Sequence, residues 1–102
     1  MKICVIGGGG AIGGYLAVML ARAGNEVTVV ARGATLAAIK ERGLALIMDD
    51  QPEPLVAQVK AVEKIADAET PDVVILAVKA HQVDPIVQDL AKLMGPETIL
   101  IP

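Results

Sequence analysis

The sequence contains no tryptophan and no phenylalanine, and Tyr15 is its single large aromatic residue. Proteins that bind single-stranded nucleic acid stack the bases on aromatic side chains, and this chain offers no such platform. Its formal net charge of −3 would also repel a phosphate backbone. We therefore expect no nucleic-acid partner.

Cysteine and histidine are equally scarce, with one of each in the chain. Cys4 has no partner for an internal disulfide and lies in an apolar run, which predicts a small buried core residue in a reducing compartment. His81 is best interpreted as a surface residue near the start of a helix. We expect no metal site.

No apolar run approaches the ~18 residues needed to cross a bilayer, so we expect no membrane association. The opening MKICVIG lacks the small-residue cleavage site of a signal peptide, which favours a cytoplasmic location. Apolar residues make up 54% of the chain and charged residues 21%, as in globular proteins. At 102 residues the chain corresponds to one compact domain.

The first half of the chain alternates between two periodicities. Residues 2–6 (KICVI) form a short β-branched run typical of a buried strand, and residues 12–23 have the apolar spacing of a helix. A second strand is predicted over 26–31 and a second helix over 34–42, closed by Gly43. Two strand-helix units are therefore complete by residue 43.

The next stretch predicts a hairpin, because a DDQPEP turn separates the apolar residues 44–48 from the apolar residues 55–62. Residues 72–78 (DVVILAV) are apolar without alternation. That pattern is typical of a strand covered on both faces, and we expect it in the interior of the sheet.

The last part predicts a helix and one more strand. Asp84 is interpreted as the N-cap of a helix that has Pro85 at its first position and continues up to Gly95. Residues 98–101 (TILI) form the final strand. Strands that alternate with helices predict the α/β class, here a Rossmann-like, doubly wound and mostly parallel sheet.

A glycine-rich motif lies between the first strand and the first helix. Gly8 to Gly13 satisfy the G-x-G-x-x-G pattern of dinucleotide-binding domains. Gly8 would allow the tight turn, Gly10 the approach of a pyrophosphate, and Gly13 the packing of the helix on the strand. The pyrophosphate would then lie on the amides at the helix N-terminus.

One extra glycine leaves a second register open. Gly7 intervenes between the strand and the motif, so Gly7 and Gly9 could take the first two roles, with Gly10 inserted before Gly13. We prefer the register of Gly8, Gly10 and Gly13, because it keeps the spacing into the helix.

The end of the second strand distinguishes the two nicotinamide dinucleotides. An acid there would bind the 2'-hydroxyl of NAD, whereas an arginine would bind the 2'-phosphate of NADP. The sequence reads VVARGAT, with Arg32 at this position and Glu26 at the opposite end of the strand. A guanidinium forks well onto phosphate oxygens, so we predict NADP as the cofactor.

The segments AIGG, ARG after the second strand, AVKAHQ and TILIP together resemble the N-terminal part of the ketopantoate reductases (2-dehydropantoate 2-reductases). This resemblance implies an NADPH-dependent oxidoreductase that reduces 2-dehydropantoate to pantoate in pantothenate and coenzyme A biosynthesis. It also implies that Lys79 and Gln82 lie on the nicotinamide side of the cofactor. The candidate cofactor-binding residues are Gly8, Gly9, Gly10, Ala11, Ile12, Gly13, Arg32, Lys79 and Gln82.

Family members continue into an Asn-Gly segment and a helical C-terminal domain that carries the lysine general acid and a substrate-binding acid. Residues 1–102 therefore resemble a partial dinucleotide-binding domain without catalytic residues of its own, and we expect no turnover by this chain alone. The sheet edge at TILI leaves apolar surface uncovered, which predicts self-association.

Three alternatives remain open at this stage. The chain could be a non-catalytic module that binds or senses NADP, or a structural α/β domain whose glycine turn binds nothing. It could also belong to a reductase of another small 2-oxo acid, since the substrate-binding residues lie outside this stretch.

Overall fold

The computed structural model describes residues 1–7, 11–46, 53–78 and 84–101 of the chain; the remaining residues lie outside these ranges. Strands, α-helices and single turns of 3-10 helix follow one another along the sequence. The elements are β1 (Lys2–Ile6), α1 (Ala11–Arg22), β2 (Glu26–Val30), α2 (Gly33–Arg42), β3 (Leu44–Leu46), β4 (Leu55–Ala57), β5 (Lys60–Val62), η1 (Ile65–Asp67), β6 (Val73–Leu76), η3 (Asp84–Ile86), α3 (Val87–Leu93) and β7 (Ile99–Ile101).

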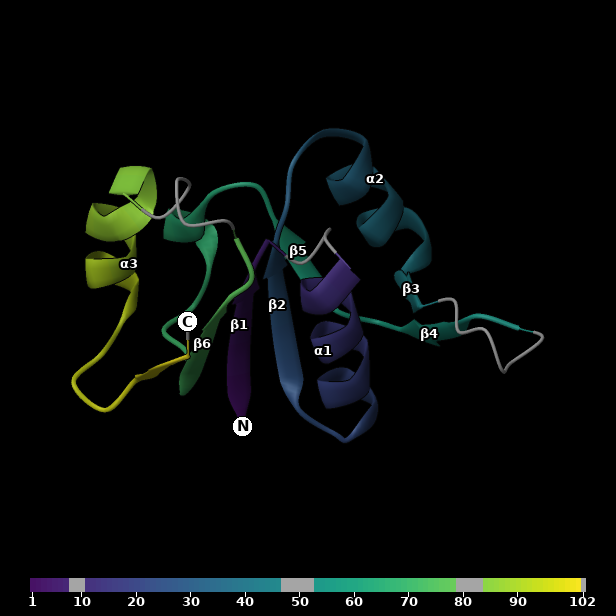
Figure 1. The fold of residues 1–102 in the computed structure, drawn as a ribbon, viewed down its shortest axis with the longest axis horizontal. Helices are drawn as coiled ribbons and strands as arrows, with labels where there is room; N and C mark the ends of the chain where they lie inside the picture. Colours follow the sequence, from purple (N-terminus) through teal and green to yellow (C-terminus); the bar gives the residue numbers. More distant parts are fainter. Residues whose placement is uncertain (8–10, 47–52, 79–83, 102) are drawn as a thin grey trace.

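Five of these strands form one parallel sheet in the order β5-β2-β1-β6-β7, with β1 in the middle. The chain moves outward from β1 through β2 to β5 and then crosses to β6 on the other side of β1. This reversal is the switch point of a doubly wound sheet, beside which open α/β sheets bind ligands. The predicted Rossmann-like architecture is confirmed (Figure 1).

Both faces of the sheet are covered, and the alternation of side chains along each strand divides the core in two. Val5 and Val29 are fully buried on the face that packs against Ala17 and Val18 of α1. The opposite face packs against α3 and η1, and its buried residues are Cys4, Ile6, Ile65, Val74, Leu90 and Leu93. Figure 1 shows α1 to the right of β2 and α3 to the left of β6, on opposite sides of the strands.

The strand predicted over 72–78 is observed as β6, between β1 and β7. Val74 is fully buried and Ile75 is 8% exposed, so its interior position is confirmed. β7, in contrast, is an edge strand with all three residues exposed.

The hairpin prediction is partly wrong. β3 and β4 pair antiparallel, with Leu44 opposite Ala57 and Leu46 opposite Leu55. Residues 55–62 are not one strand, however, because the chain leaves the hairpin after Ala57 and β5 joins the main sheet parallel to β2. Both pieces have similar apolar character, and periodicity does not specify which strand a segment pairs with.

The helix prediction near the C-terminus also needs correction. Asp84 lies inside the 3-10 turn η3, whereas the N-cap of α3 is Ile86, which makes no side-chain capping bond. The backbone of Ile86 (φ −107°, ψ −1°) separates the two helical segments. α3 ends at Leu93, because Met94 is already extended at ψ 129°.

Candidate cofactor-binding site

Gly7 follows β1 directly and occupies the point where three strand ends meet. Its φ of +89° lies in the left-handed region that favours glycine. Its N–H donates to the carbonyl of Val30 at the end of β2 (3.3 Å). A β-carbon there would lie 2.7 Å from the carbonyl oxygen of Ala77 and 2.9 Å from Cγ1 of Val78, so the close approach also requires glycine.

This geometry gives Gly7 the turn-forming role that we assigned to Gly8 from the sequence. It favours the alternative register, in which the motif begins with the residue that directly follows the strand. Gly8, Gly9 and Gly10, where the two registers differ, lie outside the described residues. The end of the strand was the sequence signal that pointed to Gly7, since the first glycine of this motif makes the turn there.

α1 begins at Ala11, so its N-terminus lies at the carboxyl edge of β1. The first turn of the helix contains no acidic residue, which leaves the positive end of the helix dipole without a competing carboxylate. Ala11 and Ile12 belong to this turn, and Gly13 is buried within it. These residues lie where the amides of a pyrophosphate site are expected.

Arg32 lies at the carboxyl end of β2, on the strand adjacent to β1. It is the N-cap residue of α2 in extended conformation (φ −134°, ψ 161°), and its carbonyl accepts the N–H of Leu36 (3.4 Å). Its side chain is exposed and makes no ion pair with any of the described residues. The first turn of α2 has no acid, and Glu26 lies at the opposite end of β2, as predicted.

The carboxyl end of β6 reaches the same edge, because the N–H of Ala77 donates to the carbonyl of Ile6 (2.9 Å). Lys79 and Gln82, the candidates for the nicotinamide side, lie beyond Val78 and outside the described residues, as does His81. Their placement at this edge stays a prediction.

Cys4 lies beneath this edge in the middle of the sheet and is 1% exposed. Desolvation by burial raises the pKa of its thiol from 9.0 to about 11, so the group stays protonated at neutral pH. Cys4 is therefore a core residue, as predicted from the sequence, because a reactive cysteine needs an accessible thiolate.

The described part of the chain has neither a candidate metal-binding cluster nor a membrane-spanning helix. Within the described ranges, no three His, Cys, Asp or Glu side chains are grouped so that they could hold a metal ion. Nor does any helix there have the length and apolar character to span a membrane.

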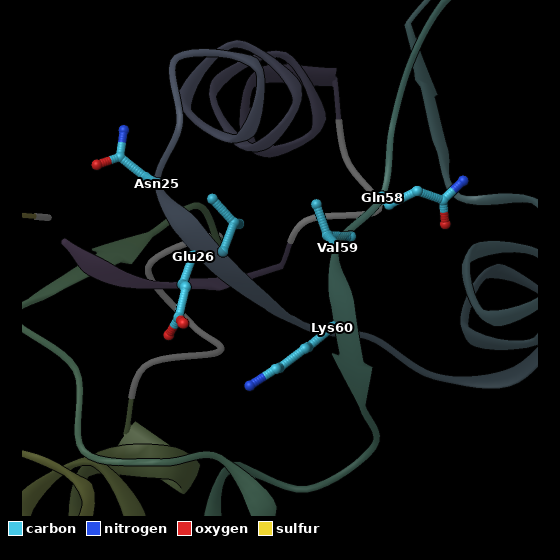
Figure 2. Close-up of a pocket in the computed structure, with 6 residues that line it drawn as sticks. Asn25, Glu26, Gln58, Val59 and Lys60 are labelled. Carbon is cyan, nitrogen blue, oxygen red and sulfur yellow. The ribbon is translucent and has the colours of Figure 1, made fainter.

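A shallow pocket of about 360 Å³ lies at the opposite, amino edge of the sheet. In Figure 2, Glu26 and Lys60 extend from the starts of β2 and β5 toward the same side, whereas Asn25 and Gln58 point outward. The pocket is therefore remote from Gly7 and Arg32, and it is not the predicted cofactor site.

Comparison with known proteins identifies the family of the chain. A family model described as ketopantoate reductase PanE/ApbA matches residues 3–102. The chain belongs to the ketopantoate reductase family. A 2-dehydropantoate 2-reductase from Mesorhizobium japonicum is 45% identical over 102 residues, which are 99% of this chain and 30% of that protein.

Solved structures of ketopantoate reductases share the fold. A PanE/ApbA family ketopantoate reductase from Ralstonia eutropha superposes with a TM-score of 0.87 at 28% identity, over 98% of this chain and 33% of that one. D-mandelate dehydrogenase, solved with NADH and anilino(oxo)acetate, gives a TM-score of 0.81 at 31% identity, over 98% and 32%. The chain thus spans about a third of the length of the ketopantoate reductases that it matches.

Proposed function

We propose that the chain is the NADPH-binding part of an oxidoreductase that reduces 2-dehydropantoate to (R)-pantoate, a step toward pantothenate and coenzyme A. Membership of the ketopantoate reductase family supports the reaction class. The observation that carries the cofactor assignment is the position of Arg32, exposed at the carboxyl end of β2 beside the N-terminus of α2.

The residues at the switch point fit a dinucleotide. Gly7 brings the main chain close to β6 without a side chain in the way, and α1 begins just beyond it. In this proposal Gly8, Gly9, Gly10, Ala11, Ile12 and Gly13 hold the pyrophosphate through backbone amides. Lys79 and Gln82, which follow β6, would hold the nicotinamide side.

Arg32 would select NADP over NAD. NADP differs from NAD by a 2'-phosphate, and a guanidinium binds phosphate oxygens through charge-assisted, often bidentate hydrogen bonds. An NAD site at this position would instead present a carboxylate to the 2'-hydroxyl. The end of β2 and the first turn of α2 contain no carboxylate.

When bound, the nicotinamide supplies a hydride to the keto carbon of the substrate. The oxygen then needs a proton from a positioned protein group. The resemblance to the family places that lysine, and the substrate-binding acid, in the helical domain that follows this segment in family members. We therefore propose that these 102 residues bind the cofactor weakly and do not turn over.

Titration of NADPH and NADH into the protein, followed by the fluorescence of the reduced nicotinamide, tests the cofactor assignment. We expect tighter binding of NADPH, and an Arg32→Ala variant should weaken it by roughly tenfold to a hundredfold with little effect on NADH. Arg42→Ala is the matched control, because Arg42 is exposed at the other end of α2. An unchanged preference in Arg32→Ala would refute the role of Arg32.

A second candidate is a reductase of another small 2-oxo acid. The likeness to D-mandelate dehydrogenase, solved with NADH and anilino(oxo)acetate, favours it because the fold is the same at comparable identity. The change in NADPH fluorescence when each of a panel of 2-oxo acids, 2-dehydropantoate among them, is added to the NADPH-bound protein separates the candidates without requiring turnover. Oxidation of NADPH that depends on 2-dehydropantoate would overturn the proposed inactivity of this chain and confirm the substrate.

A further inference from the structure

The carboxyl ends of β2 and β5 lie next to each other at the edge that carries Arg32. The two strands pair in parallel, with Thr28 opposite Lys60 and Val30 opposite Val62. The ladder continues past the strand ends, because the N–H of Ala31 donates to the carbonyl of Val62 (3.0 Å). Extended two positions beyond the Val30–Val62 pair, the same register would bring Arg32 opposite Lys64.

The backbone conformation supports this juxtaposition. Arg32 (φ −134°, ψ 161°) and Lys64 (φ −113°, ψ 142°) are both extended, and each is the N-cap residue of the helical segment that follows. Neighbouring strands lie roughly 5 Å apart, and residues in register project from the same face of the sheet. Side chains alternate along an extended backbone, so Glu63, one position earlier, would leave on the other side.

Lys64 carries a positive charge at this edge, and we have given it no other role. It is exposed, and no carboxylate in the described part of the chain forms an ion pair with it. The ion pair that the described residues do contain, Lys2 with Glu69, is formed by the first residue of β1 at the amino edge.

A phosphate monoester carries about 1.5 to 2 negative charges at neutral pH, so one guanidinium does not neutralise it. We infer that Lys64 is a second cation of the 2'-phosphate site, acting with Arg32 from the adjacent strand, and that it sets part of the preference for NADP. This inference rests on the proposed NADP-binding function. The lysine ammonium on its flexible side chain would add positive charge to the site. The planar guanidinium of Arg32 would orient the phosphate through directed hydrogen bonds.

The test compares Lys64→Gln with Lys60→Gln. Lys60 is a suitable control, because it is an exposed lysine at the start of β5, in register with Thr28 and at the amino edge, opposite the edge that carries Arg32. Dissociation constants are measured for NADPH and NADH, and also for 2',5'-ADP and 5'-AMP, which differ in the 2'-phosphate alone. Amide chemical shifts monitored by NMR detect binding even when it is weak.

We expect Lys64→Gln to weaken NADPH and 2',5'-ADP by about two- to fivefold, as for a solvent-exposed charge pair, and to leave NADH and 5'-AMP unchanged. The loss should shrink at high salt, and Lys64→Arg should restore most of the affinity. Lys60→Gln should match the wild-type protein.

The outcomes distinguish the role of Lys64 from the proposed NADP-binding function on which it rests. If Arg32→Ala abolishes the preference for NADPH while Lys64→Gln leaves it intact, Lys64 has no part in the site and the inference alone is wrong. Equal losses for NADPH and NADH in Lys64→Gln would also contradict it. If the wild-type protein does not prefer NADPH to NADH, the proposed NADP site and the role of Lys64 fail together.

Discussion

Lys2 and Asp72, 70 residues apart in the sequence, are joined by two reciprocal hydrogen bonds. The N–H of Lys2 donates to Oδ2 of Asp72 (2.8 Å), and the N–H of Asp72 donates to the carbonyl of Lys2 (2.7 Å). The carbonyl of Asp72 also accepts the N–H of Ile99 (3.0 Å). Asp72 therefore fastens β1, β6 and β7 together at the amino edge of the sheet.

Replacing Asp72 by Ala should lower the free energy of unfolding by about 0.5 to 1.5 kcal/mol, because the N–H of Lys2 loses its acceptor while the backbone bonds remain. Urea denaturation measures this loss. Glu69→Gln is the control, since it removes the exposed ion pair with Lys2 (3.3 Å), and we expect a change below about 0.5 kcal/mol. Equal effects of the two variants would show that the carboxylate of Asp72 does not fasten the strands.

Gly7→Ala should destabilise the protein more than Gly24→Ala does. Both glycines have positive φ, +89° and +99°, so an alanine at either site costs about 1 to 3 kcal/mol of backbone strain. At Gly7 the new methyl group would also meet the carbonyl oxygen of Ala77, whereas nothing lies within 4 Å at Gly24. Thermal denaturation of the pair isolates the steric effect, and equal melting temperatures would argue against the close approach.

Burial of Cys4 should make the protein less stable as the pH rises from 9 toward 11. The folded-state pKa, about 11, lies above the ordinary value of 9.0, so the unfolded state loses its thiol proton first. Deprotonation in that range then favours unfolding, by up to roughly 2 to 3 kcal/mol in total.

Urea unfolding of the wild-type protein and of Cys4→Ala, measured across this pH range, isolates the contribution of the thiol from those of other titrating groups. The stability of the wild-type protein should fall more steeply with pH. Parallel curves would contradict the prediction. A thiol reagent should also react slowly at Cys4 until urea unfolds the chain.

The edge strand β7 should cause self-association. Ile99, Leu100 and Ile101 are 60%, 41% and 47% exposed, and no strand pairs with the outer side of β7 within the described part of the chain. Light scattering at increasing concentration should show growing particles, and Leu100→Lys should reduce their size, because charge on an edge strand opposes pairing. A monodisperse monomer at high concentration would rule this out.

Much of the fold was predictable because its strands and helices have strong periodicity and clear stops. The strand over residues 2–6 is observed with the predicted bounds, and the helices that end before Gly24 and Gly43 agree to within one residue at each end. Both glycines adopt the positive φ expected where a helix stops.

The sequence was less informative where the outcome depends on a tertiary partner. Residues 55–62 divide between a hairpin and the main sheet, because α1 packs against the hairpin while β2 has a vacant edge for β5. Similarly, composition could not show that Gly7 lies against Ala77, 70 residues later. The position of Arg32 was predictable, because it depends on counting from the glycine motif to the end of the next strand.

The middle position of β1 has a consequence for how the chain folds during synthesis. One neighbour of β1 comes from residues 26–30, but the other comes from residues 73–76. At ribosomal rates of about 5 to 20 residues per second, the second edge of β1 remains unpaired for several seconds after β2 has paired with the first. The nascent chain therefore exposes one side of its central strand while residues 31–76 are made, which makes it a natural client for chaperones near the exit tunnel.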